Sequence, residues 1–255
     1  MGAVDRYLQE QHIDRYAFLP FSACRILQPH KLRNCGEVKT VLLLLTPYYD
    51  GDAADRNLSL YAVPRDYHLF FRELFAGLRE AFALDHPGAS FHAFADSSPI
   101  DEVDAAAKAG LGLFGDNRML IEERYGPFVF IGEVLTDADI PCESGEVREC
   151  EHCGRCACSH EVCLSSLTQK KGELSGEEKA ALRNHPLVWG CDDCLLACPH
   201  AKNVEKTPIP FFKTDKQYRL THEMLENMDE EAFSSRAYSW RKRETVLRNL
   251  SLHGE

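Results

Sequence analysis

Cysteines dominate the middle of this 255-residue chain and constrain what it can fold around. Eight of its eleven cysteines fall within residues 150–198, in two groups. The groups read Cys150-x2-Cys153-x2-Cys156-x-Cys158, followed by Cys163, and then Cys191-x2-Cys194-x3-Cys198-Pro199. Eight thiolates are the number that two 4Fe–4S clusters require, and a cysteine before proline is typical of two-cluster ferredoxins. The pattern therefore predicts two iron–sulfur clusters.

Paired cysteines also bind zinc or form disulfides. Zinc would use the two groups as separate four-ligand knuckles, which leaves the cysteine–proline ending unexplained. A disulfide framework is disfavoured because the cysteine count is odd and the polar N-terminus has no signal-peptide core. We therefore expect a cytoplasmic protein in which Cys24, Cys35 and Cys142 are free thiols.

Composition and charge narrow the class of protein further. With 44% hydrophobic residues, the chain can bury a core as one large domain with a small insert. No apolar run approaches the roughly 20 residues of a membrane span, so we expect no membrane partner. The net charge of −11 gives no global attraction to nucleic acid, although basic residues gather between Arg241 and Arg248.

Strand and helix patterns alternate over residues 1–140 and indicate a layered, mixed α/β domain. The expected elements are a buried strand at 41–45, a helix from the N-cap Asp66 to about Leu84, a short strand at 91–94 that ends at Asp96, a helix at 99–109 and a strand at 128–135. Residues 141–207 form the cysteine module, with a helix opened by the capping box of Ser175 and Glu178. Residues 208–255 form a helical tail that we expect to pack on the first domain.

Glycines cluster directly after the predicted helix at 99–109. Gly110-x-Gly112-x-x-Gly115 matches the dinucleotide-binding fingerprint on paper, but it follows a helix and precedes a strand, which is the wrong context. We expect instead that these glycines let the backbone approach a flat ligand or a neighbouring strand.

Several stretches in order along the chain resemble the epoxyqueuosine reductase family, cobalamin-dependent iron–sulfur enzymes of tRNA queuosine synthesis. The matching stretches are Leu60-Tyr-Ala-Val-Pro-Arg-Asp-Tyr-His68, Asp96-Ser-Ser-Pro99, Ala109-Gly-Leu-Gly-Leu-Phe-Gly115, Phe130-Ile-Gly-Glu133, Cys163-Leu-Ser-Ser-Leu-Thr168, Gly190-Cys-Asp-Asp-Cys-Leu-Leu-Ala-Cys-Pro199 and the tail from Arg243 to Leu250. The cysteine-rich stretch and the Asp96 segment are the specific ones. The resemblance implies an α+β fold, in which a nitroreductase-like cobalamin-binding domain is joined to a ferredoxin-like module with two 4Fe–4S clusters.

The resemblance also implies the roles of individual residues. Cluster one would take Cys150, Cys153, Cys156 and Cys198, and cluster two would take Cys158, Cys163, Cys191 and Cys194. Cobalamin would bind between the domain and the module, with its lower base detached, and its contacts would be Arg65, Tyr67, Asp96, Leu120, Gly132, His185, Ala201 and Lys202. Tyr67 and His68 could instead simply begin a packed helix, and Lys202 could be a solvated loop charge.

Asp96 is the residue to which the family's proton donor corresponds. Reductive C–O cleavage leaves a developing alkoxide that a positioned acid must protonate. At a buried strand end beside an apolar cofactor, desolvation would raise the pKa of Asp96, so that it keeps its proton near neutrality. The alternative is that Asp96 is the N-cap of the following helix, because Asp-Ser-Ser-Pro is a good helix entry.

This chain departs from the family pattern in its first cysteine group. By spacing, the fourth ligand position is His160, whereas Cys158 comes two residues earlier; we expect Cys158 to be the ligand because clusters prefer thiolate. The family usually carries a C-terminal helical-repeat domain that contacts tRNA, which we expect this chain to lack.

Three functions follow from these features. The first is an epoxide reductase that acts on tRNA epoxyqueuosine or a related compound, supplied by a low-potential electron donor of the flavodoxin or ferredoxin type. The second is a cobalamin-free electron carrier with the same two clusters, and the third is a corrinoid carrier without turnover.

Overall fold

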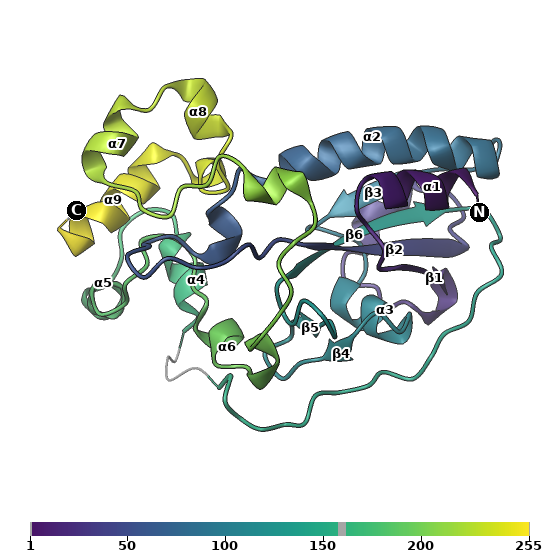
Figure 1. Ribbon diagram of the computed structural model, residues 1–255, viewed down its shortest axis with the longest axis horizontal. Coiled ribbons are helices and arrows are strands. Elements are labelled where there is room, and N and C mark those ends of the chain that lie inside the picture. The colour runs from purple at the N-terminus through teal and green to yellow at the C-terminus, as the bar shows by residue number, and fades with distance from the viewer. Residues whose placement is uncertain (1, 158–161, 255) are drawn as a thin grey trace.

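The computed structural model describes residues 2–157 and 162–254 as a mixed α/β fold around one antiparallel sheet (Figure 1). The sheet has four strands in the order β1-β2-β6-β3, and β4 pairs with β5 in a separate ribbon. The strands are β1 (Tyr16–Pro20), β2 (Thr40–Pro47), β3 (His92–Ala95), β4 (Leu113–Phe114), β5 (Leu120–Ile121) and β6 (Val129–Thr136). The helices are α1 (Ala3–Glu10), α2 (Tyr67–Asp85), α3 (Glu102–Lys108), α4 (Leu164–Thr168), α5 (Gly176–Arg183), α6 (Asp193–Leu196), α7 (His222–Asn227), α8 (Glu230–Ser234) and α9 (Arg243–His253). Within the described ranges, no helix has both the length and the apolar character needed to cross a membrane.

Both faces of the sheet are covered, which explains the uninterrupted apolar run in β2. Leu42 and Leu44 pack on the face that α1 and α2 cover, whereas Leu43 packs on the side of α3 (Figure 1). Successive side chains of a strand point to opposite faces, so a strand between two helical layers needs an apolar residue at each position. Every residue of β2 is buried, as the sequence predicts.

Most predicted elements are confirmed, with shifts at their ends. α2 begins directly after Asp66, whose carboxylate accepts a hydrogen bond from the backbone amide of His68, and β3 and β6 lie where the sequence predicts them. The capping box that opens α5 is present. α3 begins at Glu102, later than predicted, because Asp101 is its N-cap. The sequence did not single out α1, β1 or the β4–β5 ribbon.

The C-terminal helices lie at one end of the molecule, away from the sheet (Figure 1). They share a core cluster with Trp189 from the cysteine module and Leu58 from the first part of the chain, both fully buried. The side-chain amide of Asn249 in α9 donates hydrogen bonds to the carbonyl oxygens of Thr168 (2.8 Å) and Val188 (2.9 Å). The tail therefore packs on the module and on the segment around Leu58, and the three-part division of the chain stays a prediction.

The glycine-rich turn lets two strands approach each other closely. A Cβ at Gly112 would lie 2.6 Å from the backbone oxygen of Ile121 in β5, closer than a side chain can be accommodated. Gly110 has a φ of +78°, a left-handed conformation that favours glycine just after the end of α3. Of the two predicted reasons for this turn, the neighbouring strand is confirmed at Gly112.

Candidate functional site

Four cysteines meet in one pocket beside the β4–β5 ribbon. The pocket is lined by Cys150, Cys153, Cys156 and Cys198, together with Gly115 and residues next to it. The backbone amide of Cys150 donates to the Phe114 carbonyl (3.0 Å), which ties the first cysteine group to β4. Burial raises the pKa of Cys156 and Cys198, and nearby thiols add to the rise. Four thiols around one small pocket are the donor set of one 4Fe–4S cluster, so these residues fit that group.

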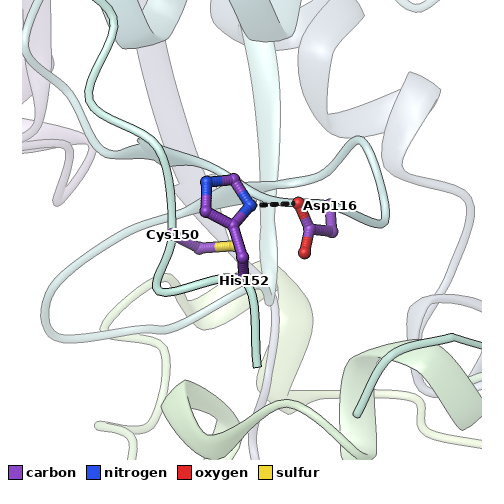
Figure 2. A group of neighbouring side chains, drawn as sticks. All are labelled: Asp116, Cys150 and His152. Atoms are coloured by element: carbon purple, nitrogen blue, oxygen red, sulfur yellow. Dashed lines mark hydrogen bonds and ion pairs between the residues drawn. The ribbon is translucent and has the colours of Figure 1, made fainter. Parts of the chain in front are cut away.

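Asp116 and His152 lie beside Cys150, one of the four cysteines of this pocket (Figure 2). The Nδ1 of His152 lies 2.7 Å from the Asp116 carboxylate, and its Nε2 lies 3.2 Å from the Glu149 carboxylate. One ligand atom from each of Asp116, Cys150 and His152 lies within 4.8 Å of the others. Sequence spacing did not identify Asp116 or His152. A divalent ion bound there would share Cys150 with the predicted cluster.

The second cysteine group lies where α6 begins. The sulfur of Cys191 is 3.7 Å from the Nε2 of His185, and the Asp193 carboxylate is 3.3 Å from the same nitrogen. Cys194 lies within α6, and its carbonyl oxygen accepts a hydrogen bond from the side chain of Asn117 (3.4 Å). This bond joins the module to the turn between β4 and β5.

The other predicted ligands of the second cluster come from the segment before α4. Cys163 is exposed and directly precedes α4. Leu164, the next residue, belongs to the core cluster against which Cys191 packs. The sequence left Cys158 and His160 as candidates for the remaining ligand, with Cys158 expected, and both lie outside the described residues. The ligand set of this cluster therefore stays a prediction.

Asp96 lies at the end of β3 on a turn with unusual backbone geometry. Asp96 and Ser97 have φ values of +56° and +40°, a left-handed conformation that residues other than glycine rarely adopt. The Tyr67 hydroxyl donates a hydrogen bond to the Asp96 carboxylate, and the Nε2 of His68 lies 3.6 Å from it. The Lys31 ammonium donates to the Ser97 hydroxyl (2.7 Å). Strained backbone that surrounding contacts hold in place is typical of functional sites.

The side chain of Asp96 is 51% exposed, and its burial beside a bound cofactor stays a prediction. The alternative that Asp96 caps α3 is wrong, since the carboxylate of Asp101 accepts the hydrogen bond from the backbone amide of Asp104 (3.3 Å). Without the helix-cap role, the contacts that position the Asp96 carboxylate are those with Tyr67 and His68.

Partly buried apolar side chains pack against the core cluster that contains Tyr67, the partner of the Asp96 carboxylate. The Tyr67 ring stacks on Phe130 with 4.1 Å between ring centroids, and the Arg65 guanidinium lies 4.6 Å from the centroid of Phe211. Partly buried residues that rest on one core cluster are Met119, Phe130, Ala201 and Phe211. An apolar surface of this kind beside an acid fits a large flat cofactor such as cobalamin.

The remaining predicted cobalamin contacts lie in other environments. Leu120 is only 2% exposed, and His185 is buried next to Cys191. A Cβ at Gly132 would overlap the ring of Phe71, so packing inside the protein already accounts for this glycine. Lys202 is exposed. Contact of these residues with a cofactor stays a prediction.

Tyr61 lies between the Asp96 turn and the module, and sequence patterns did not identify it. Its hydroxyl accepts a hydrogen bond from the Nε1 of Trp189 (3.0 Å). Burial raises the pKa of Tyr61, and the negative charges of Asp192 and Asp96 raise it further. The Tyr61 phenol is therefore influenced by the charge of Asp96 and by that of Asp192, which lies between Cys191 and Cys194 in sequence.

Two carboxyl groups, one fully buried and one partly buried, lie near the Asp96 turn on the α3 side of the sheet. Glu133 in β6 is fully buried, and neither of its carboxylate oxygens has a partner at hydrogen-bond geometry among the described residues, although the Ser98 side chain is near enough to oppose the rise in its pKa. Burial raises the pKa of Glu133 to about 8 and that of Glu102 to about 7, and the charge of Asp96 contributes at Glu102. The sequence signal for Glu133 is a charged residue inside an otherwise apolar strand.

Comparison with known proteins shows which family shares this sequence and fold. No protein-family model matches the chain. An epoxyqueuosine reductase from Leadbetterella byssophila is 31% identical over 215 residues, which cover 77% of this chain and 69% of that relative. A crystal structure of epoxyqueuosine reductase with an epoxyqueuosine-modified tRNA stem loop has a TM-score of 0.78 at 19% identity, covering 98% of this chain and 79% of that one. A Bacillus subtilis epoxyqueuosine reductase, described with its aspartate-bearing catalytic loop swung out of the active site, has a TM-score of 0.77 at 19% identity, with the same coverage.

These similarities differ in what they establish. The two solved structures are only 19% identical to this chain in sequence, so they show that the fold is shared and no more. The chain spans about half the length of several other curated epoxyqueuosine reductases that it matches. The L. byssophila relative is 31% identical, and the match covers 69% of that relative, which is enough to place both sequences in one family. This chain belongs to the epoxyqueuosine reductase family.

Proposed function

We propose that this chain is a cobalamin-dependent iron–sulfur reductase that reduces an epoxide, either epoxyqueuosine in tRNA or a related smaller compound. The main support for this proposal is the pocket lined by four cysteines. The chain also belongs to this family and has an acid, Asp96, on a strained turn. The tRNA stem loop bound by a protein of the same fold supports tRNA as the substrate class. A low-potential protein of the flavodoxin or ferredoxin type would supply the electrons.

The finer architecture is part of the same proposal. Residues 1–140 would be a nitroreductase-like cobalamin-binding domain, residues 141–207 a ferredoxin-like module with two clusters, and residues 208–255 a helical tail. The antiparallel sheet, with α1 and α2 on one face and α3 on the other, supports the assignment of residues 1–140. A cytoplasmic location stays a prediction.

The residues of this chain would position and protonate the substrate. Asp96 would give its proton to the oxygen on which negative charge develops as the C–O bond breaks. Tyr67 holds the Asp96 carboxylate through its hydroxyl, and the stacking on Phe130 fixes the Tyr67 ring. Cobalamin, when bound against the partly buried apolar residues around Phe130 and Phe211, would supply a strongly reducing metal centre fed by the two clusters.

About eight irons and eight sulfides per chain are expected after anaerobic reconstitution, because two 4Fe–4S clusters contain that number. Replacing Cys198 with alanine should lower both values to about four, since it removes a ligand of cluster one. Cys142→Ala removes a cysteine outside both predicted clusters; it is the matched control and should leave the iron content unchanged. Iron and sulfide assays with zinc analysis make the measurement, and stoichiometric zinc without iron in anaerobic protein would contradict the assignment.

Titration of the anaerobic protein with cob(II)alamin tests the cofactor proposal. Electron spin resonance should show a bound cobalt without its lower base. Phe211→Glu places a charge among the partly buried apolar residues and should weaken cobalamin binding. Leu84→Glu, at the far end of α2 and 75% exposed, should leave the binding unchanged. An unchanged spectrum of free cobalamin at saturating protein would favour the cobalamin-free electron carrier. Binding without reduction of an epoxide would favour the corrinoid carrier.

A further inference from the structure

Reduction of an epoxide by two electrons consumes two protons. If the oxygen leaves as water, both protons end on that oxygen; if the ring opens to an alcohol, one hydrogen ends on oxygen and the other on carbon. One carboxylic acid holds a single proton, so an acid that supplies both must be protonated again within each turnover. This reasoning rests on the proposed function and applies to Asp96, which is its proposed proton donor.

His68 is placed to return a proton to Asp96. Its Nδ1 lies 2.8 Å from a carboxylate oxygen of Asp66, and its Nε2 lies 3.6 Å from the carboxylate of Asp96. The same Asp66 oxygen accepts a hydrogen bond from the backbone amide of His68 (3.0 Å), so the start of α2 holds the carboxylate in place. The Tyr67 ring lies against the imidazole, with 4.2 Å between ring centroids.

The partners of the two ring nitrogens assign different roles to them. An ionised carboxylate can only accept a hydrogen bond, so the contact with Asp66 keeps a proton on Nδ1. Nε2 is then the nitrogen that gains and loses a proton. The side chain of His68 is 52% exposed, so water can reach the ring while one edge faces Asp96. A separation of 3.6 Å exceeds a hydrogen bond, and a small side-chain rotation or one bridging water closes it.

We propose that His68, oriented by Asp66, is a proton relay that recharges Asp96 from solvent within each turnover. In the step, the N–H bond at Nε2 of the imidazolium breaks and an O–H bond forms on the Asp96 carboxylate. Neutral imidazole with its proton on Nδ1 remains, and water then protonates Nε2 again. The two electrons come from the low-potential donor of the proposed function, so the relay moves protons only.

The charges around His68 favour its protonated form. Asp66 faces the ring from the N-cap of α2, and Asp96 faces it from the turn after β3. The hydrogen bond to Asp66 raises the pKa of His68 above its ordinary value of 6.5, and the charges of both carboxylates add to this, against an opposing effect of burial. His68 therefore stays protonated to a higher pH than a free histidine, and it loses its proton as the pH rises further.

Epoxide reduction by a His68→Gln variant, measured against pH, tests the relay. Turnover should fall by about tenfold or more near neutral pH, which is less than the roughly hundredfold or greater loss typical of removing a general acid, because water replaces the relay in part. The wild-type rate should decline as the pH rises through the pKa of His68; the variant should lack this decline, and added imidazole should restore part of its rate. His92→Gln, at the other end of β3, is the control and should keep the wild-type rate and profile. A wild-type rate and pH profile in His68→Gln would overturn the relay.

Asp66→Ser provides a second variant in case His68→Gln folds poorly. Serine is also a good N-cap, so α2 keeps its start while the imidazole loses its orienting carboxylate. Turnover should again fall, and an unchanged rate would count against the relay. A wild-type chain that reduces no epoxide would refute the proposed function, and the relay with it. The relay alone fails if the wild type is active and both variants match it.

A nuclear magnetic resonance titration of the reconstituted, oxidised protein gives a readout that does not depend on turnover. The pKa of the His68 imidazole should be lower in Asp96→Asn than in the wild type, because the variant removes a facing negative charge. Asp139→Asn, whose carboxyl is not among the groups that act on His68, is the control and should leave this pKa unchanged. An unchanged pKa of His68 in Asp96→Asn would show that the two groups are not coupled and would overturn the relay.

Discussion

An Asp96→Asn variant is expected to reduce its epoxide substrate at least about a hundredfold more slowly than the wild type, the usual scale for losing a general acid. Asparagine has nearly the same shape and can still accept the hydrogen bond from the Tyr67 hydroxyl. It carries no acidic proton to give to the developing alkoxide. The content of iron and cobalamin should therefore be unchanged, and single-turnover rates of the reconstituted protein make the measurement.

Asp101→Asn is the matched control for this prediction. Asp101 is the true N-cap of α3, and asparagine caps helices about as well as aspartate, so turnover should be close to wild type. Some stability is expected to be lost, because the Asp101 carboxylate is paired with Arg25 (3.6 Å) and Arg118 (3.7 Å). An Asp96→Asn variant that is less stable but equally active per folded molecule would contradict the role of Asp96 as the acid. It would mean that the turn after β3 matters for folding alone.

Raising the pH is expected to destabilise the fold by several kcal/mol through one side chain, Glu133. Burial raises its pKa from the ordinary 4.5 to about 8 in the folded protein, so the folded state holds a proton that the unfolded chain has released. The contribution of Glu133 to stability is complete below about pH 4.5 and is lost as the pH rises through 8. Each pKa unit corresponds to about 1.4 kcal/mol, which sets the expected size.

Urea unfolding of the wild type and of Glu133→Gln at several pH values tests this expectation. Glutamine cannot ionise, so the variant should lose the part of the decline in unfolding free energy between about pH 5 and pH 9 that Glu133 contributes, whereas the part due to Glu102, whose pKa is raised to about 7, should remain. The slope with pH is the readout, because the change of side chain also alters stability at every pH. Glu123→Gln, at an exposed site, should keep the wild-type slope. The same slope in Glu133→Gln would show that Glu133 is not protonated in the folded protein.

Local sequence patterns predicted the elements that depend on neighbouring residues. The apolar run of β2 identified a strand covered on both faces, and Asp66 identified the start of α2. Cysteine spacing brought Cys150, Cys153 and Cys156 together, because C-x2-C places two sulfurs close to each other whatever the wider fold, but by spacing Cys198 belonged to the other group. The start of α3 was missed by a few residues, since two aspartates, Asp96 and Asp101, both match a helix cap.

The meeting of distant residues was decided by the tertiary structure alone. Cys198 reaches the pocket of Cys150 only because the module folds back on the β4–β5 ribbon. In the same way, His68 faces Asp96 because the end of β3 and the start of α2 are brought together by packing on one sheet. The sequence by itself determined which residue types were available and where helices and strands form, since those signals act over a few residues. Exposure, pKa and contact depend on strand register and layer packing, which join residues far apart in the chain and which no short pattern encodes.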